Sequence, residues 1–213
     1  MLIAFEGIDG SGKTTQAEML SDRLTGLSIR NTLVREPGGT QLGEGVRELL
    51  LHRTDLRIHP VTEFFLFTAS RSQLVREKVI PLLKDGSTVI LDRYFYSSIA
   101  YQGFGRGLPV DRVEAVSEFA IQDVLPDLVF VVKVDPEDAL KRRLLSGRGS
   151  DRMEDSELQF FRRVSDGFKY CADREPNRFV VVDGADNVEK ISNKIFDIVM
   201  SKMRKVMEER NAT

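Results

Sequence analysis

The chain has 213 residues, of which 41% are hydrophobic and 30% are charged, and its formal net charge is -2. This length suffices for one globular domain with a sizeable core, and the nearly balanced charge gives no general attraction to nucleic acid or to anionic membranes. One cysteine and two histidines disfavour an internal disulfide and a Cys/His zinc site, and no apolar run approaches the ~18 residues of a membrane span.

Short β-branched runs alternate with amphipathic segments along the whole chain. The first run lacks the basic residues that begin a secretion signal, which favours a cytoplasmic protein. Strands are predicted at 2–6, 31–35, 88–92, 128–134 and 179–183, and helices at 12–27, 41–51, 61–84, 94–102, 109–124, 135–146, 154–174 and 186–208. This alternation predicts an α/β fold with a parallel sheet. No repeat or linker interrupts it, so we expect residues 1–213 to form a single domain.

The stretch GIDGSGKTT, at 7–15, matches the phosphate-binding pattern GxxxxGK[ST] between the first predicted strand and the first predicted helix. Glycines let backbone N–H groups converge on phosphate oxygens, and a helix N-terminus adds positive potential. Lys13 would reach the outer phosphates, and Thr14 would offer a hydroxyl to Mg²⁺. A chance glycine turn is the alternative. We expect a nucleoside triphosphate to bind here through Gly7, Ile8, Asp9, Gly10, Ser11, Gly12, Lys13, Thr14 and Thr15.

Asp92 and Arg93 stand at the end of the third predicted strand. The carboxyl ends of parallel strands gather at one edge of a sheet, and this edge also receives the loop at 7–15 and the segment EPGGT at 36–40. There Asp92 would hold Mg²⁺ through water, and Arg93 would clamp a phosphate. A simple salt bridge at the strand end is the alternative, and the neighbouring phosphate loop favours the functional interpretation.

Phe67 and Arg71 are four residues apart in a predicted helix, so they share a helical face. An aromatic plane beside a forked donor could stack on a nucleobase and bond its carbonyl oxygen. Core packing of Phe67 and a solvated Arg71 are the alternative. The same spacing links Ser97 to Tyr101 and Ser98 to Gln102, for which a polar helix surface is the alternative.

Basic residues gather at the end of the predicted helix 135–146 and beyond it, at Lys141, Arg142, Arg143, Arg148 and Arg152. A run of charge is usually a solvated face. Glycines at 147 and 149 interrupt this run, which is typical of a segment that closes over phosphates. We therefore expect a lid at about 143–155.

The stretches GIDGSGKTTQ, REPGGTQLGEGVRELLL, FFLFTASR, DRYFYSSIAYQGFGRG and SDRMED follow one another in an order that resembles the thymidylate kinase family, whose members phosphorylate dTMP to dTDP. The similarity runs from about residue 1 to residue 184. It implies a P-loop nucleoside monophosphate kinase fold with a five-stranded parallel sheet flanked by helices. It also implies a homodimer, ATP as the phosphoryl donor and Mg²⁺.

Carried over position by position, the resemblance implies an acceptor site. Arg35 and Arg93 would hold the dTMP phosphate, Phe67 would stack on thymine, and Arg71 and Ser98 would read the polar edge of the base. The complete set implied for dTMP is Asp9, Arg35, Glu36, Pro37, Phe67, Arg71, Arg93, Ser97, Ser98, Tyr101 and Gln102, in which Tyr101 would crowd the 2' side of the sugar.

The catalytic charge is also implied by the resemblance. Some members of the family carry a catalytic arginine where this chain has Gly10, so lid arginines would supply it here, with Arg143, Arg148 and Arg152 as the candidates. Asp9 would face the acceptor's sugar hydroxyl or a phosphate-clamping arginine, and a hydrogen bond that stabilises its own loop is the alternative. The catalytic set is Lys13, Arg93, Arg148, Arg152 and Asp9, with Thr14 and Asp92 for Mg²⁺.

Two other activities share parts of this pattern. A deoxynucleoside kinase has a phosphate loop and a lid, but its neutral hydroxyl acceptor needs a carboxylate base, whereas the dianionic phosphate of a monophosphate needs none. A nucleotide-dependent switch would read guanine through NKxD, and the nearest string here, NKIF at 193–196, lacks the acid.

Overall fold

A computed structural model describes residues 1–145 and 155–211. It contains a five-stranded parallel sheet of β1 (Leu2–Glu6), β2 (Asn31–Arg35), β3 (Thr88–Asp92), β4 (Leu128–Lys133) and β5 (Phe179–Asp183). The strands lie in the order β2-β3-β1-β4-β5. The predicted parallel sheet is confirmed, and β1 is buried along its whole length at the centre of the sheet.

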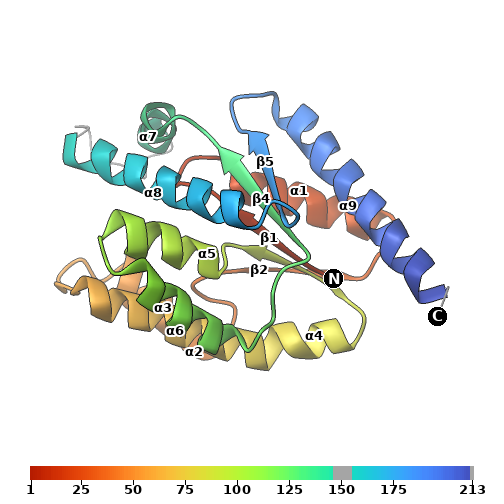
Figure 1. Ribbon diagram of the computed structural model, residues 1–213, viewed down its shortest axis with the longest axis horizontal. Coiled ribbons are helices and arrows are strands. Elements are labelled where there is room, and N and C mark those ends of the chain that lie inside the picture. The colour runs from red at the N-terminus through yellow and green to blue at the C-terminus, as the bar shows by residue number, and fades with distance from the viewer. Residues whose placement is uncertain (146–154, 212–213) are drawn as a thin grey trace.

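Helices cover both faces of this sheet (Figure 1). They are α1 (Lys13–Gly26), α2 (Gln41–Leu51), α3 (Pro60–Leu74), η1 (Val75–Val79), α4 (Ile80–Lys84), α5 (Phe95–Ser98), η2 (Ile99–Gly105), α6 (Val110–Ile121), α7 (Pro136–Leu145), α8 (Asp155–Arg174) and α9 (Val188–Asn211). Apolar side chains of α1 and α9 form one core cluster with Ile3 and Phe5 of β1. Those of α3, η1, η2, α6 and α8 form a second cluster with Leu2 and Ala4, on the opposite face, because successive side chains of a strand alternate.

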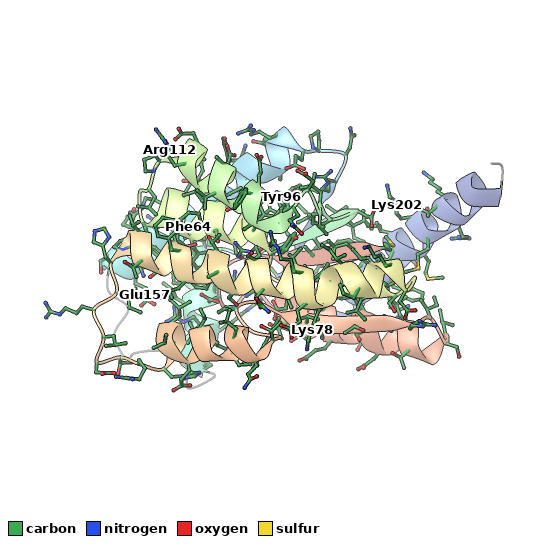
Figure 2. All side chains as sticks on the ribbon, turned by 90° about the horizontal axis from the view of Figure 1, so that it is seen from below. Phe64, Lys78, Tyr96, Arg112, Glu157 and Lys202 are labelled. Atoms are coloured by element: carbon green, nitrogen blue, oxygen red, sulfur yellow. The ribbon has the colours of Figure 1, made fainter. Side chains whose placement is uncertain are left out.

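The helix predicted at 61–84 is corrected by the structure. Its middle is the π-helix η1, where the Ile80 N–H bonds to the Val75 carbonyl oxygen, five residues back. Pro81 accounts for the wider turn, because proline has no N–H to give to the carbonyl four residues before it. Figure 2 looks onto α3, η1 and α4 as they cross the molecule, with the labelled and buried Phe64 on α3. The segment predicted at 94–102 is also wider than an α-helix and longer, since η2 continues to Gly105.

The carboxyl ends of β1, β2 and β3 meet at one edge of the sheet. Parallel pairing places Arg35 of β2 opposite Asp92 of β3, and Asp92 opposite Phe5 of β1. The next residues along each strand are therefore neighbours, and they begin the loop at 7–15, the EPGG segment and the segment that starts at Arg93. Within the described residues, no helix has the length and apolarity that crossing a membrane requires.

Candidate active site

The loop at 7–15 connects β1 to α1, and α1 begins at Lys13. Its backbone needs glycine at position 10, where φ is +85° and a Cβ would lie 2.4 Å from the Ala139 carbonyl oxygen. The loop is tightened by a bond from the Ser11 N–H to the Ile8 carbonyl oxygen, at 3.2 Å. The first N–H groups of an α-helix have no partner within the helix. Together these features form a cradle of backbone donors for phosphate oxygens.

Lys13 is a buried cation beside this cradle, with 7% of its surface exposed. Its Nζ lies 3.8 Å from Asp9 Oδ1. Burial and the positive charge of Arg93 together lower the pKa of Lys13 to about 8, although Asp9 and other carboxylates act in the opposite direction. A phosphate oxygen at this position would favour the charged ammonium, so Lys13 is suited to hold one.

Thr14 and Asp92 place a hydroxyl oxygen and a carboxylate next to each other. The Thr14 hydroxyl donates to Asp92 Oδ2 at 2.6 Å. The other carboxylate oxygen, Oδ1, is buried and has no hydrogen-bond partner among the residues that the structure describes. Magnesium prefers oxygen ligands and retains several waters, so a hydroxyl and a carboxylate with an unused oxygen fit it. Across 1–145 and 155–211, no group of three or more His, Cys, Asp or Glu side chains offers another metal site.

Arg93 contacts both the phosphate loop and η2. Its Nη1 donates to the Gly7 carbonyl oxygen at 3.0 Å, and its Nη2 donates to Asp9 Oδ1 at 2.6 Å and to the Tyr101 hydroxyl at 3.0 Å. The backbone of Arg93 is left-handed, with φ of +74°, which is strained for a residue with a side chain. This geometry fixes a guanidinium directly beside the loop at 7–15.

Asp9 is the acid within the anion-binding loop, and its neighbours explain it. Burial alone would raise the pKa of its carboxyl, but the charges of Arg93 and Lys13 outweigh burial and hold the pKa well below its usual range. The Tyr101 hydroxyl donates to Asp9 Oδ2 at 3.1 Å and receives the Asp9 N–H at 3.1 Å. Asp9 is therefore an ionised counter-charge that ties the loop to Arg93 and Tyr101.

A second arginine is buried on the side of α3. Arg71 and Glu36 have side chains that are each 2% exposed, and Arg71 Nε lies 2.7 Å from Glu36 Oε2. Arg71 Nη1 also donates to Ser98 Oγ at 2.9 Å, and Nη2 donates to the Tyr94 carbonyl oxygen at 3.4 Å. Glu36 Oε1 is buried and unpaired within the described part of the chain. Arg71 thus joins three separate segments through buried polar contacts: α3, the segment after β2 that holds Glu36, and the segment at 94–98.

Phe67 lies one helical turn from Arg71 and is half-buried. Gln102 is 4% exposed, and its Nε2 donates to Glu63 Oε1 at 2.9 Å. The residues predicted to hold a base therefore lie on α3 and on the facing α5–η2 segment, where Arg71 joins the two across the gap in sequence. Phosphate groups would lie toward Arg93, and a base would lie toward Arg71.

Comparison with known proteins agrees with this geometry. The thymidylate kinase family model matches residues 5–195. The chain belongs to the thymidylate kinase family. The thymidylate kinase of Kosmotoga olearia is 45% identical over 195 residues, covering 92% of this chain and 93% of the relative, and that of Thermoanaerobacter sp. (strain X514) is 42% identical over 197 residues, covering 92% and 96%. A crystal structure of thymidylate kinase from Ehrlichia chaffeensis has a TM-score of 0.76 and 33% identity, and the alignment covers 93% of this chain and 98% of that one.

Two of the three lid arginines expected for this thymidylate kinase family member, Arg148 and Arg152, lie outside the described residues. Arg143, the third candidate, is described: its Nη1 lies 2.7 Å from Glu157 of α8, and its guanidinium is over the ring of Phe161. At the other candidate position this chain has Gly10, whose φ is +85° and where a Cβ would lie 2.4 Å from the Ala139 carbonyl oxygen.

Arg35 lies at the rim of the site. It is exposed, and its Nη2 lies 3.5 Å from Glu44 Oε2. Arg47, a residue that sequence reasoning missed, donates from Nη1 to the carbonyl oxygen of Pro37 at 2.9 Å, and Pro37 follows a cis peptide bond. Burial and the positive charge of Arg35 both lower the pKa of Arg47, so the two cations share one region. In the sequence, Arg47 could have been selected as a candidate because it lies one helical turn after Glu44, within the stretch that begins with REPGG.

Glu6 is the second residue that sequence reasoning missed. It is fully buried, and it accepts the Tyr94 N–H at 2.8 Å and the Ser97 hydroxyl at 2.5 Å. The Ser97 hydroxyl in turn accepts from Arg93 Nη1 at 2.9 Å. Ser97 therefore points toward Arg93 and Glu6, and the structure places it as a support for Arg93. A lone acid at the end of an apolar strand, directly before the phosphate loop, was the available signal.

Proposed function

We propose that this chain catalyses the ATP-dependent phosphorylation of dTMP to dTDP by in-line phosphoryl transfer. The observation that carries the proposal is the position of Arg93, which bonds to Gly7 and Asp9 of the loop at 7–15 and also to Ser97 and Tyr101 of the α5–η2 segment. A cation at this point can neutralise charge between two phosphates. Family membership and the named relatives supply the substrate class.

The reaction has to overcome repulsion between two polyanions. The phosphate of dTMP is largely dianionic at neutral pH, because its second pKa is ~6, so no general base is needed. Lys13 would hold the outer phosphates of ATP, Arg93 would hold the acceptor phosphate, and the lid residues Arg148 and Arg152 would spread charge in the transition state. Asp9 would keep Arg93 oriented before substrates bind. Catalysis in this proposal rests on position and charge.

The thymine base would be held on α3. Phe67 would stack on the ring, and the buried Arg71, fixed by Glu36 and Ser98, would donate to a carbonyl oxygen of the base. Tyr101, held by Asp9 and Arg93, would lie at the sugar and crowd a 2'-hydroxyl. Arg35, at the rim of the site, would reach the acceptor phosphate.

Magnesium belongs to the same proposal. Thr14 and Asp92 would hold it, partly through water, and this role is supported by the buried Asp92 Oδ1, which has no hydrogen-bond partner in the described part of the chain. The ion would neutralise charge on the donor phosphates. Ligation would require the Thr14 hydroxyl to turn an oxygen lone pair toward the ion while Asp92 stays in place.

The assembly and location are proposed as follows. Phe65 of α3 and Phe119 of α6 are 55% and 83% exposed, and α3 packs on α6, so these exposed aromatic side chains support a homodimer formed through the two helices. Residues 1–213 would form one catalytic domain with a lid at 143–155. A free, buried Cys171 fits a reducing cytoplasm.

A panel of acceptors tests the proposed activity. ADP release would be measured with ATP, Mg²⁺ and each of dTMP, dUMP, dCMP, dGMP, AMP and thymidine. We expect dTMP to give the highest kcat/KM. Phosphorylation of thymidine but not dTMP would identify a deoxynucleoside kinase instead. GTP hydrolysis with no response to any acceptor would favour a nucleotide switch.

A further inference from the structure

Two hydrogen bonds between α3 and the α5–η2 segment flank Phe67. Glu63, Phe67 and Arg71 are spaced by four residues on α3, so they follow one stripe of that helix. At one end of the stripe, Arg71 donates to Ser98 Oγ at 2.9 Å. At the other end, Gln102 Nε2 donates to Glu63 Oε1 at 2.9 Å. A ring stacked on Phe67 would therefore have Arg71 at one end and Gln102 at the other.

The contact with Glu63 fixes which way the Gln102 amide faces. A carboxylate can only accept hydrogen bonds, whereas a primary amide has an NH₂ side that donates and an oxygen side that accepts. Gln102 must therefore turn its NH₂ group to Glu63. Its Oε1 then points away from Glu63, and it accepts no hydrogen bond from the residues that the structure describes. Gln102 is only 4% exposed, so its amide group is not free to rotate in solvent.

Arg106 keeps Glu63 in this role. Its Nη2 lies 3.0 Å from Glu63 Oε2, and its Nε lies 3.3 Å from Oε1. The forked guanidinium holds both oxygens of the carboxylate, which favours one orientation of Glu63. The side chain of Glu63 is 17% exposed, so it is partly shielded from water. Arg106, Glu63 and Gln102 thus form a chain in which each member orients the next.

We propose that Glu63 is a specificity-positioning residue: it holds the NH₂ group of Gln102 so that Gln102 Oε1 faces the N3 position of a pyrimidine ring. Thymine carries a hydrogen on N3 and can donate to this oxygen, whereas neutral cytosine has a lone pair there and is rejected. The inference rests on the proposed function and extends it. Arg71 would contact one end of the base, and Glu63 would orient Gln102, which would contact the base at N3.

The experiment replaces the carboxylate with the isosteric amide, Glu63→Gln. The introduced amide can donate to Gln102 Oε1, so Gln102 becomes free to turn its NH₂ group to the base and accept cytosine. We expect the ratio of kcat/KM for dTMP to that for dCMP to fall about tenfold, since one buried polar pairing is lost for thymine and gained for cytosine. The KM for dTMP should carry most of the change, with kcat at saturating dTMP within a few-fold of the unaltered enzyme. An unchanged ratio would overturn the proposal.

Two further variants separate amide orientation from other effects. Gln73 Nε2 donates to Glu77 Oε2 at 2.7 Å on the exposed surface, so Glu77→Gln makes the same chemical change in a matched pair and should leave the ratio unchanged. Arg106→Gln removes the ion pair but keeps the Glu63 carboxylate, which can still only accept from Gln102, so the ratio should fall clearly less than in Glu63→Gln. If Arg106→Gln lowered the ratio as far as Glu63→Gln, charge rather than amide orientation would be responsible, and the proposal would fail.

Melting temperatures of all variants are measured alongside. If Glu63→Gln lowered both kcat/KM values in proportion and also lowered Tm, Glu63 would be a structural support and the proposal would be overturned. An unaltered enzyme that does not phosphorylate dTMP would remove the proposed function, and this inference with it. An unaltered enzyme active on dTMP, with an unchanged ratio in Glu63→Gln, would remove this inference alone.

Discussion

The proposed donor side, which would hold ATP, and the proposed acceptor side, which would hold dTMP, are built in different ways. The donor side is a contiguous loop, 7–15, whose main donors are backbone N–H groups, and Gly12 and Thr14 there are exposed. The acceptor side consists of buried side chains from separate segments, with Arg71 and Glu36 paired at 2.7 Å. Backbone donors exist in any sequence that folds into the loop, whereas a side-chain network depends on each member. A single substitution should therefore damage the acceptor side more selectively.

The largest expected effect is on stability, in Arg71→Ala. This change leaves the buried Glu36 carboxylate without its partner, and we expect the free energy of unfolding to fall by about 3–5 kcal/mol. Burial already raises the pKa of Glu36, and the charge of Arg71 opposes that rise. Urea denaturation at pH 7.5 measures the loss. Selectivity for dTMP over dCMP should weaken in the same variant.

A double variant sharpens this result. Replacing both partners, Glu36→Leu with Arg71→Leu, removes the uncompensated charge, so part of the stability should return. Selectivity for dTMP should not return, because the donor to the base is still absent. If Arg71→Ala were as stable as the unaltered protein, the buried pair would not be holding the acceptor side together.

The next effect is on turnover, in Arg93→Ala. We expect kcat to fall by about 10²–10³-fold with dTMP, because the variant loses a fixed cation where charge develops between the phosphates. ATP affinity, measured by calorimetry, should change little, since the backbone donors of the loop remain. Arg112→Ala is the matched control: Arg112 is an exposed arginine on α6, labelled in Figure 2. Turnover like that of the unaltered enzyme would remove Arg93 from the site.

This contrast also explains what could be predicted from the sequence. The strands, the parallel sheet and the loop at 7–15 follow local rules, namely alternating runs and one contiguous motif, so each could be predicted from adjacent residues. The role of Pro81 in widening η1 was missed, because the sequence from 61 to 84 otherwise has an uninterrupted helical period.

The proposed acceptor side rests largely on the resemblance to thymidylate kinases. Arg71 and Glu36 are 35 positions apart, and no periodicity joins them. Glu6 is the clearest omission: it bonds to Tyr94 and Ser97, some 90 positions away, and only the pairing of β1 with β3 brings them together. Contacts of this kind depend on tertiary structure, which composition and spacing do not specify.

The third prediction concerns Glu6 and pH. Burial raises the pKa of Glu6 from 4.5 to about 7, although Arg93 and hydrogen bonds from Ser97 and Tyr94 act against it. Below pH 4.5 the group is protonated in both the folded and unfolded states. As pH rises from 4.5 to 7, the unfolded state loses this proton first, so the contribution of Glu6 to stability falls, by up to ~3 kcal/mol.

Glu6→Gln tests this directly, because glutamine does not titrate. The stability of Glu6→Gln relative to the unaltered protein should rise between pH 4.5 and pH 7.5, as measured by denaturant unfolding at several pH values. Glu118→Gln, at an exposed position of α6, is the control and should follow the unaltered protein. Parallel curves for Glu6→Gln and the unaltered protein would show that Glu6 has an ordinary pKa.

The smallest expected effect comes from Ser98→Ala, which removes one contact of the Arg71 network and no charge. Ser98 is 1% exposed, and its hydroxyl accepts from Arg71 Nη1 at 2.9 Å. Arg71 keeps Glu36, so we expect the dTMP to dCMP ratio of kcat/KM to fall only about fivefold, the value of one neutral hydrogen bond. Ser98→Thr, which retains a hydroxyl, should recover part of the ratio if the extra methyl is accommodated. An unchanged ratio in Ser98→Ala would mean that Glu36 and the Tyr94 carbonyl oxygen suffice to orient Arg71, and that the Ser98 hydroxyl is not needed to read the base.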